Sequence, residues 1–577
     1  MSQNIRCLCF RNHPIKQRNP SRRDTNVNHN QAPSAQQAPQ GLNQHPSQVT
    51  TATEPMDSTS AHNANASGAI AAPLTVNVSG PDAASRHAAM ADVIVSGTTE
   101  EEAFFLTDLG DVCRKHKRWQ AHLPMVEPFY AVKCNSDPAI LGTLAALGAN
   151  FDCASLGEIQ AILNLGVSSD RVIFANPCKA IAHLRFAKQV GVRMMTFDNE
   201  FELLKIAKHY PGAALVLRVL ADDSRSACRL GLKFGADPAV TGHLLQLARQ
   251  LGLDVVGVSF HVGSGATDAR AFADAVARAR AVFDEAAALG FSPHLLDVGG
   301  GFPGDDPAAT PAAAVRFEDI ARELRSAFAE HFPPSAVPGL RIIAEPGWYY
   351  VASASSLAVC ITSKRRVVDV TATTPTATTG ATPTTPASNA TPHPATEPPP
   401  KFMYYVNDGV YQSFNCIIFD HARVQAQVLY TGNGVPAMDD EHLAAAVLHE
   451  SSVWGPTCDS IDCVQASTML PELDVGDWLV FDNMGAYTSC AASTFNGFAL
   501  TKHVYTFSHV LVDLQRVPAA DGIAHVPAAL PLAAGFAVAP SAATTPAVTA
   551  TLGAATAAIA RAPKPVGHAV PIPTPVS

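Results

Sequence analysis

The stretch EPFYAVKCNSDP, residues 127–138, places a lysine directly after a short apolar run. Residues 129–132 read as a buried β-strand, and the Asn-Ser-Asp-Pro sequence at 135–138 is typical of a turn. Lys133 lies at the junction of the two. A lysine at a strand end is most often a solvated flank, so the stretch alone does not identify a functional residue. The pattern of strands and helices that follows along the chain does identify Lys133 as a candidate functional residue.

Eight strand-like runs alternate with amphipathic helical stretches between residues 129 and 347. They read FYAVK, ANFDCAS, RVIFANP, RMMTFDN, ALVLRVL, VVGVSFHVG, HLLDVGGG and RIIAEPG. Strands that are apolar almost throughout, each followed by a helix, indicate a parallel sheet whose outer side is covered. Eight such units in about 220 residues favour a closed (β/α)8 barrel over an open doubly wound sheet.

Polar residues and glycines recur at the ends of these strands. They are Lys133, Asp152, Asn176, Arg218, His261, Gly299, Gly300, Gly301 and Glu345. In a closed parallel barrel these ends meet at the face that carries active sites. A solvated flank explains one such residue, but it does not explain a lysine, an arginine, a histidine and two acids together. The sequence therefore predicts an active site at this face.

The chemistry of this set fits pyridoxal phosphate. Lys133 can form a Schiff base with a carbonyl, and the glycines at 299–301 allow backbone amides to approach a phosphate, although a sharp turn would also use them. Glu345 can keep a pyridine nitrogen protonated, and His261 can stack on a planar ring, unless it is a satisfied core histidine. The rival interpretation, a Schiff-base aldolase, would need neither His261 nor Glu345.

A second domain is predicted after the barrel. The runs FMYYVNDGVYQSFN, DWLVFDNMGAY and HVYTFSHVLV are β-rich and lack helical periodicity, which is typical of a β-sandwich or small barrel. The same region contains SSVWGPTCDSID, in which a Trp-Gly-Pro turn presents Cys458 and Asp459. A buried structural cysteine beside a turn-forming aspartate is an equally good interpretation of this motif.

Composition excludes several classes of protein. The net charge of the 577-residue chain is −10, which argues against a nucleic-acid-binding protein. No run reaches the roughly 18 apolar residues of a membrane-spanning helix. The twelve cysteines are scattered without zinc spacing, so no metal site is predicted, and reduced thiols suggest an intracellular, cytoplasmic protein. An arginine-rich beginning leaves import into an organelle as the alternative.

The predicted organisation has four parts. They are a disordered tail at 1–98, the barrel at 99–350, a β-domain at 351–515 interrupted by a Thr/Pro-rich insertion at 368–400, and a disordered Ala/Pro-rich tail at 520–577.

Taken together, the motifs resemble those of the eukaryotic ornithine decarboxylase family, of the alanine-racemase-like fold type. They are FYAVKCN, FDCAS, HVGSG, DVGGGFPG, EPG, YYVNDGVYQSFN, WGPTCDSID and GDWLVFDNMGAYT, in order from about residue 102 to 505. The resemblance implies pyridoxal phosphate as cofactor, conversion of L-ornithine to putrescine and carbon dioxide, and a head-to-tail homodimer with shared active sites. It also implies antizyme as a possible partner, although the acid-poor C-terminal tail does not imply regulated turnover.

The resemblance also implies a role for each matching residue. Lys133 matches the lysine that bonds to the cofactor, Glu345 the acid at the pyridine nitrogen, and His261 the stacking histidine. Other cofactor-binding positions are matched by Asp152, Arg218, Ser264, Gly299, Gly300, Gly301 and Tyr487. Cys458 looks like the cysteine that guides proton return, while Asp420 and Asp459 look like the acids that hold the distal ammonium. In the family, Cys458 and Asp459 would come from the partner chain.

One position departs from the family pattern. The family motif Glu-Pro-Gly-Arg supplies an arginine to the cofactor phosphate, whereas this chain has Trp348 there. We expect weaker cofactor binding, by about 1.5–3 kcal/mol for one lost charged hydrogen bond. The departure keeps two alternatives open: a catalytically weak regulator that resembles antizyme inhibitors, and a decarboxylase for lysine or arginine. Two acids at the distal end argue against diaminopimelate.

Overall fold

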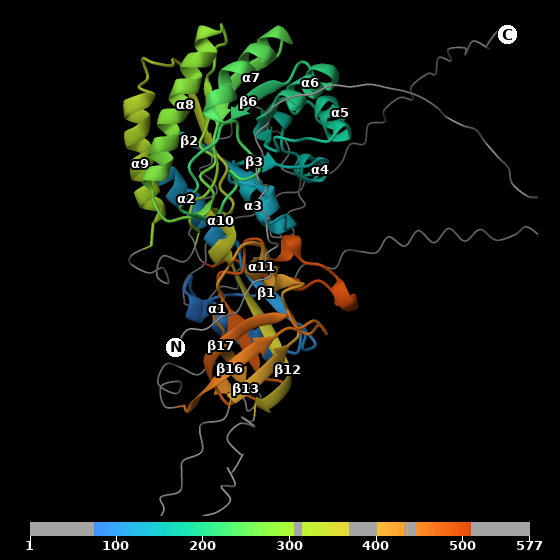
Figure 1. Ribbon diagram of the computed structural model, residues 1–577. Coiled ribbons are helices and arrows are strands. Elements are labelled where there is room, and N and C mark those ends of the chain that lie inside the picture. The colour runs from blue at the N-terminus through green and yellow to red at the C-terminus, as the bar shows by residue number, and fades with distance from the viewer. Residues whose placement is uncertain (1–73, 305–313, 368–400, 432–434, 437–445, 509–577) are drawn as a thin grey trace, which may run out of the picture. The chain divides into compact units, whose positions relative to one another are not determined.

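The computed structural model describes residues 74–304, 314–367, 401–431, 435–436 and 446–508 (Figure 1). The predicted insertion at 368–400 and tail at 520–577 lie outside this range, as does most of the predicted N-terminal tail. Within the described residues, no helix is both long and apolar enough to cross a membrane.

Eight parallel strands close into a barrel in the spatial order β10-β11-β2-β3-β4-β5-β6-β8. They are β2 (Val126–Ala131), β3 (Asn150–Cys153), β4 (Val172–Phe174), β5 (Met194–Phe197), β6 (Ala214–Arg218), β8 (Asp254–Ser259), β10 (Leu295–Asp297) and β11 (Arg341–Ala344). Each coincides with one of the eight predicted runs. The predicted closed barrel is therefore confirmed.

Helices surround the barrel strands (Figure 1). They are α2 (Leu109–His122), α3 (Pro138–Ala146), α4 (Leu156–Asn164), α5 (Ile181–Val190), α6 (Glu200–His209), α7 (Pro238–Gln250), α8 (Arg270–Ala288) and α9 (Phe317–His331). The turn after Lys133 leads into α3: the Asp137 carboxylate caps the helix by accepting from the amides of Ala139 and Ile140, and Pro138 occupies its first turn. This cap fixes where the chain leaves the rim.

A nine-stranded mixed sheet forms the second domain, with the order β15-β14-β18-β12-β13-β16-β17; β1 also pairs with β12, and β19 pairs with β1. The strands are β1 (Phe104–Asp108), β12 (Ser355–Val367), β13 (Lys401–Val406), β14 (Gln427–Thr431), β15 (Val435–Pro436), β16 (Leu448–Trp454), β17 (Cys463–Pro471), β18 (Trp478–Phe481) and β19 (Lys502–Thr506). The short helices α10 (Trp348–Val351) and α11 (Cys416–Phe419) join or border this domain. A separate pair, β7 (Ser226–Cys228) and β9 (Ser264–Ala266), extends from the barrel.

The structure differs from the predicted boundaries at the N-terminal side. Strand β1, placed by prediction in the barrel domain, pairs instead with β12 and β19 of the sheet. Helix α1 (Ala83–Val95) lies in the stretch predicted to be a disordered tail, and it buries Met90 and Val93 in the sheet domain's core. The reason is tertiary: every residue of β1 is buried, and the apolar surface that covers it comes from strands far along the chain.

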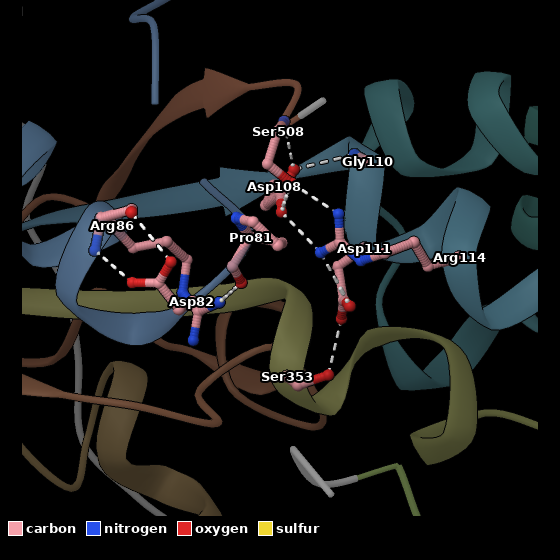
Figure 2. A network of polar contacts seen from close by, with 10 residues as sticks. Pro81, Asp82, Arg86, Asp108, Gly110, Asp111, Arg114, Ser353 and Ser508 are labelled. Atoms are coloured by element: carbon pink, nitrogen blue, oxygen red, sulfur yellow. Dashed lines mark hydrogen bonds and ion pairs between the residues drawn. The ribbon is translucent and has the colours of Figure 1, made fainter. Parts of the chain in front are cut away.

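A polar network joins the start of α2 to the end of the sheet (Figure 2). The Asp108 carboxylate accepts a hydrogen bond from the Ser508 amide at 2.9 Å, and Arg114 donates to Asp108 and Asp111 at 3.0 and 3.1 Å. Ser353 donates to Asp111 at 2.6 Å. Because Asp108 is fully buried, these contacts satisfy a charge that would otherwise be costly, and they fix the two domains together.

Candidate active site

Lys133 and Asp152 form an ion pair at the rim of the barrel. Lys133 lies in a 3-10 turn directly after β2, Asp152 lies on the neighbouring strand β3, and Nζ is 2.5 Å from Oδ2. The Asp152 side chain is fully buried, while that of Lys133 is 42% exposed. Partial desolvation acts to lower the pKa of Lys133, but the Asp152 carboxylate outweighs it and raises that pKa above its ordinary value. The lysine is therefore an ammonium held in place by the aspartate.

Glu345 and Asp297 form a buried pair of carboxyl groups beside this ion pair. Asp297 ends β10 and Glu345 follows β11, with the Glu345 amide donating to the Gly299 carbonyl at 2.6 Å. Burial raises the pKa of Asp297 to about 7, and burial together with Asp297 and Asp152 raises the pKa of Glu345 well above its ordinary value. Among the described residues, Glu345 Oε1 and Asp297 Oδ2 have no hydrogen-bond partner although both are buried.

Asp297 was missed by the sequence reasoning. The residue belongs to the motif DVGGG, in which only the glycines were singled out. An acid at the last position of a barrel strand was the available signal, because Asp152 and Glu345 were predicted as site residues from the same position.

His261 and the glycine loop lie against Glu345. The Gly263 amide donates to His261 Nδ1 at 3.0 Å, and burial, with the charges of Arg218 and Lys133, lowers the pKa of His261 well below its ordinary value. His261 is therefore a neutral imidazole. A Cβ atom at Gly300 would lie 2.8 Å from both His261 Nε2 and the Glu345 carbonyl oxygen, so only glycine fits between them.

Ser264 and Arg218 complete the barrel's part of the site. Ser264 begins β9, directly after Gly263, whose carbonyl oxygen would lie 2.5 Å from a Cβ atom at Gly301. The Ser264 segment and the glycine loop are thus in contact. Arg218 ends β6, and its charge lowers the pKa of both Asp297 and Glu345, against the effect of burial.

The sheet domain contributes Tyr487. Its amide donates to the Cys134 carbonyl at 2.9 Å, and Asn135 Nδ2 donates to the Gly485 carbonyl at 2.8 Å. These bonds place the tyrosine beside the turn that carries Lys133. Tyr487 has a positive φ of 51°, an uncommon conformation for a non-glycine residue, which the two bonds hold in place.

Asp420 lies at the end of α11 in the same site. Its Oδ1 accepts from the Cys228 thiol at 3.2 Å, while Oδ2 is buried and has no hydrogen-bond partner among the described residues. Burial raises the pKa of Asp420. Burial also raises the pKa of Tyr487, and the Asp420 charge adds to that increase, which places Asp420 within electrostatic range of the Lys133 turn.

Cys458 and Asp459 lie apart from this cluster. Cys458 is exposed, and Asp459 accepts a hydrogen bond of 2.5 Å from the hydroxyl of Tyr411. The hydrogen bonds and ion pairs of the described residues connect neither of them to Lys133. One chain thus brings together the predicted cofactor-binding residues and Asp420, but it does not bring Cys458 and Asp459 to them.

Comparison with known proteins identifies the family. The model of the pyridoxal binding domain of pyridoxal-dependent decarboxylases matches residues 109–352, and that of their C-terminal sheet domain matches residues 348–485. The chain belongs to the pyridoxal-dependent decarboxylase family. It is a decarboxylase whose cofactor is pyridoxal phosphate.

Individual relatives agree with this assignment. Mouse ornithine decarboxylase is 48% identical over 422 residues, covering 73% of this chain and 84% of the relative. Antizyme inhibitor 2 of Xenopus laevis is 47% identical over 404 residues, covering 70% and 81%. The crystal structure of the Paramecium bursaria Chlorella virus arginine decarboxylase superposes with a TM-score of 0.62 at 32% identity, covering 73% of this chain and 100% of that one.

The residues at the rim of this decarboxylase fit pyridoxal phosphate. The buried, unpartnered Glu345 Oε1 suits a protonated pyridine nitrogen, and the neutral His261 next to it suits a stacked ring. Lys133 would hold the aldehyde carbon, and the glycine loop with Ser264 and Tyr487 would hold the phosphate. Trp348 begins α10 at the position where the family pattern has its phosphate-binding arginine, so this chain lacks one positive charge there.

Proposed function

We propose that the chain converts L-ornithine to putrescine and carbon dioxide. The observation that supports this substrate most directly is Asp420, a partly buried carboxylate in the same site as Lys133, whose buried Oδ2 completes no hydrogen bond with the described residues. A buried carboxylate without a cation is unfavourable, so the site favours a ligand that carries an ammonium group at the end opposite its reacting carbon. The similarity to ornithine decarboxylases from several organisms supports the same substrate.

The proposed mechanism uses each group at a stated atom. When bound, pyridoxal phosphate supplies an electron sink for the carbanion formed as carbon dioxide leaves. Lys133 Nζ, which solvent can reach, must lose a proton before it can bond to the cofactor, and Asp152 Oδ2, at 2.5 Å, would orient it. Glu345 would hold the proton on the pyridine nitrogen. Asp420 would orient the substrate by its distal ammonium.

We further propose that the site is completed across a homodimer. Cys458 of the partner subunit would return a proton to the product carbon, and Asp459 of the partner subunit would share the distal ammonium with Asp420. The exposure of Cys458 and the absence of any described contact from it to Lys133 support a role outside its own chain's site.

The test is release of labelled carbon dioxide from carboxyl-labelled L-ornithine at saturating pyridoxal phosphate, with lysine and arginine in parallel. We expect release from ornithine that disappears in the Lys133→Ala variant. Preference for lysine or arginine would overturn the substrate assignment. No release from any of the three would favour a regulator like the antizyme inhibitor relative, and binding of purified antizyme would then be measured.

We also propose a cytoplasmic location. Fusing residues 1–98 to a fluorescent protein tests it, since accumulation of the fusion in an organelle would establish the alternative.

A further inference from the structure

Trp348 has an unsatisfied hydrogen-bond donor in the middle of the site. The side chain packs against the barrel core, and its ring centroid is 6.4 Å from that of Tyr487. The indole Nε1 is buried and completes no hydrogen bond with any described residue. A buried N–H without a partner is rare in folded proteins, because its desolvation is not compensated. The donor therefore calls for an acceptor nearby.

Asp420 carries a complementary acceptor. Its Oδ1 is engaged by Cys228, whereas Oδ2 is buried without a complete hydrogen bond. The pKa of Asp420 is raised by burial, and the two side chains whose hydrogen bonding opposes that increase are Cys228 and Trp348. The indole N–H is thus close to Asp420, although the contact falls short of full hydrogen-bond geometry.

An indole at this position cannot replace the phosphate-binding arginine. It has one N–H, no charge and no second donor, so it cannot contact a phosphate and Asp420 together.

We propose that Trp348 is a substrate-positioning residue, whose indole N–H holds Asp420 Oδ2 in the orientation that accepts the distal ammonium of a diamino acid. This inference rests on the proposed ornithine decarboxylation. If so, Trp348 has two effects: the cofactor phosphate loses an arginine, and the substrate-binding carboxylate of Asp420 gains a hydrogen-bond donor.

The test compares Trp348→Phe, which keeps a ring and loses the N–H, with Trp348→His, which keeps an N–H donor. The matched control is Trp478→Phe, because Trp478 packs against Phe104 in the core of the sheet domain, apart from Asp420. For Trp348→Phe we expect the KM for ornithine to rise roughly 3–10-fold, with kcat and the Kd of pyridoxal phosphate within about twofold of wild type. KM should rise at low pH, when Asp420 becomes protonated. In Trp348→Phe this rise should begin at a higher pH, because the Asp420 carboxylate has lost a donor that stabilises its charged form. Trp348→His should recover part of the loss.

Two results would overturn the inference. One is an unchanged KM in Trp348→Phe; the other is a change in cofactor Kd as large as the change in KM, which would indicate a purely structural or phosphate role. Calorimetric binding of putrescine to the cofactor-loaded protein repeats the comparison without turnover. If the wild type releases no carbon dioxide from ornithine, the proposed function fails, while the putrescine titration of wild type and Trp348→Phe still decides whether the indole supports diamine binding.

Discussion

The rim of the barrel and the loop that carries Cys458 differ in how their polar groups are held. At the rim, Lys133, Asp152, Asp297 and Glu345 lie within one charge network that draws on four neighbouring strand ends and on a loop of the sheet domain. On the other loop, the Asp459 carboxylate accepts only from the Tyr411 hydroxyl and the Ile461 amide among the described residues, and Cys458 is exposed. The comparison teaches that one chain brings the predicted cofactor-binding residues together, whereas the roles proposed for Cys458 and Asp459 depend on a partner subunit.

The largest effect is expected when two inactive variants, one from each half of the proposed site, are mixed and the decarboxylase activity is measured. Lys133→Ala and Cys458→Ala should each lose roughly 100-fold or more of the decarboxylase activity. An equal mixture, after subunit exchange, should recover about a quarter of the wild-type activity, because half of the dimers then contain one intact site. Carbon dioxide release from the mixture checks this. A mixture as inactive as its components would show that both halves act within one chain.

The carboxyl pair at the rim should make the cofactor-free protein less stable at higher pH. The pKa of Asp297 is about 7 in the folded protein against an ordinary 3.8, so the folded state binds more protons between these values. The stability from this proton is complete below about pH 4 and is lost as the pH rises through 7. Asp297→Asn should therefore lose less unfolding free energy between pH 5 and 8 than wild type does, by on the order of 2–3 kcal/mol.

Denaturant unfolding of the cofactor-free protein at the two pH values measures this difference. Asp254→Asn is the matched control, because Asp254 is exposed at the opposite end of its barrel strand. Equal pH dependence in Asp297→Asn and wild type would show that the rim carboxyls do not share a proton.

Restoring the arginine should strengthen cofactor binding. Trp348→Arg supplies a charged donor to the phosphate, so we expect the Kd of pyridoxal phosphate to fall by about 10–100-fold, equivalent to about 1.5–3 kcal/mol. Titration of the cofactor-free protein, followed by cofactor absorbance, checks this, with the uncharged Trp348→Phe as control. An unchanged Kd would mean that the rest of the phosphate site already compensates for the missing charge.

The smallest change in kinetics is expected in the loop that carries Asp459. Tyr411→Phe removes one of the hydrogen-bond donors to the Asp459 carboxylate, the hydroxyl whose bond keeps the pKa of that carboxyl low. The KM for ornithine should rise about 2–5-fold with little change in kcat, because a mobile carboxylate binds the distal ammonium less well. Steady-state kinetics measure it beside Tyr405→Phe in β13. If Tyr411→Phe instead lowers kcat alone, Asp459 acts on the chemical step and not on binding.

The sequence was most informative where structure repeats along the chain. Eight apolar runs with helices between them predicted the barrel, and the polar residues at their ends predicted the rim, from Lys133 to Glu345. The pairing of β1 with β12 and β19 was not predictable in this way, because its partners lie hundreds of residues away and no local pattern names them. The unpartnered donor of Trp348 and the unpartnered acceptor of Asp420 were missed for a related reason: burial and unsatisfied atoms appear only once the chain is folded.

Strand β1 has a consequence for how the protein is made. It leaves the ribosome before the barrel, yet its parallel partner β19 is close to the last described residue, and the Asp108–Ser508 bond spans 400 residues. At 5–20 residues per second, translation of that interval takes roughly 20–80 s. During this interval the apolar strand β1, with the sequence Phe-Phe-Leu, has no β19 to pair with along one edge. Unpaired strand edges of this kind are prone to aggregation. Production of this enzyme should therefore respond to slower translation or added chaperones more than its finished stability would suggest.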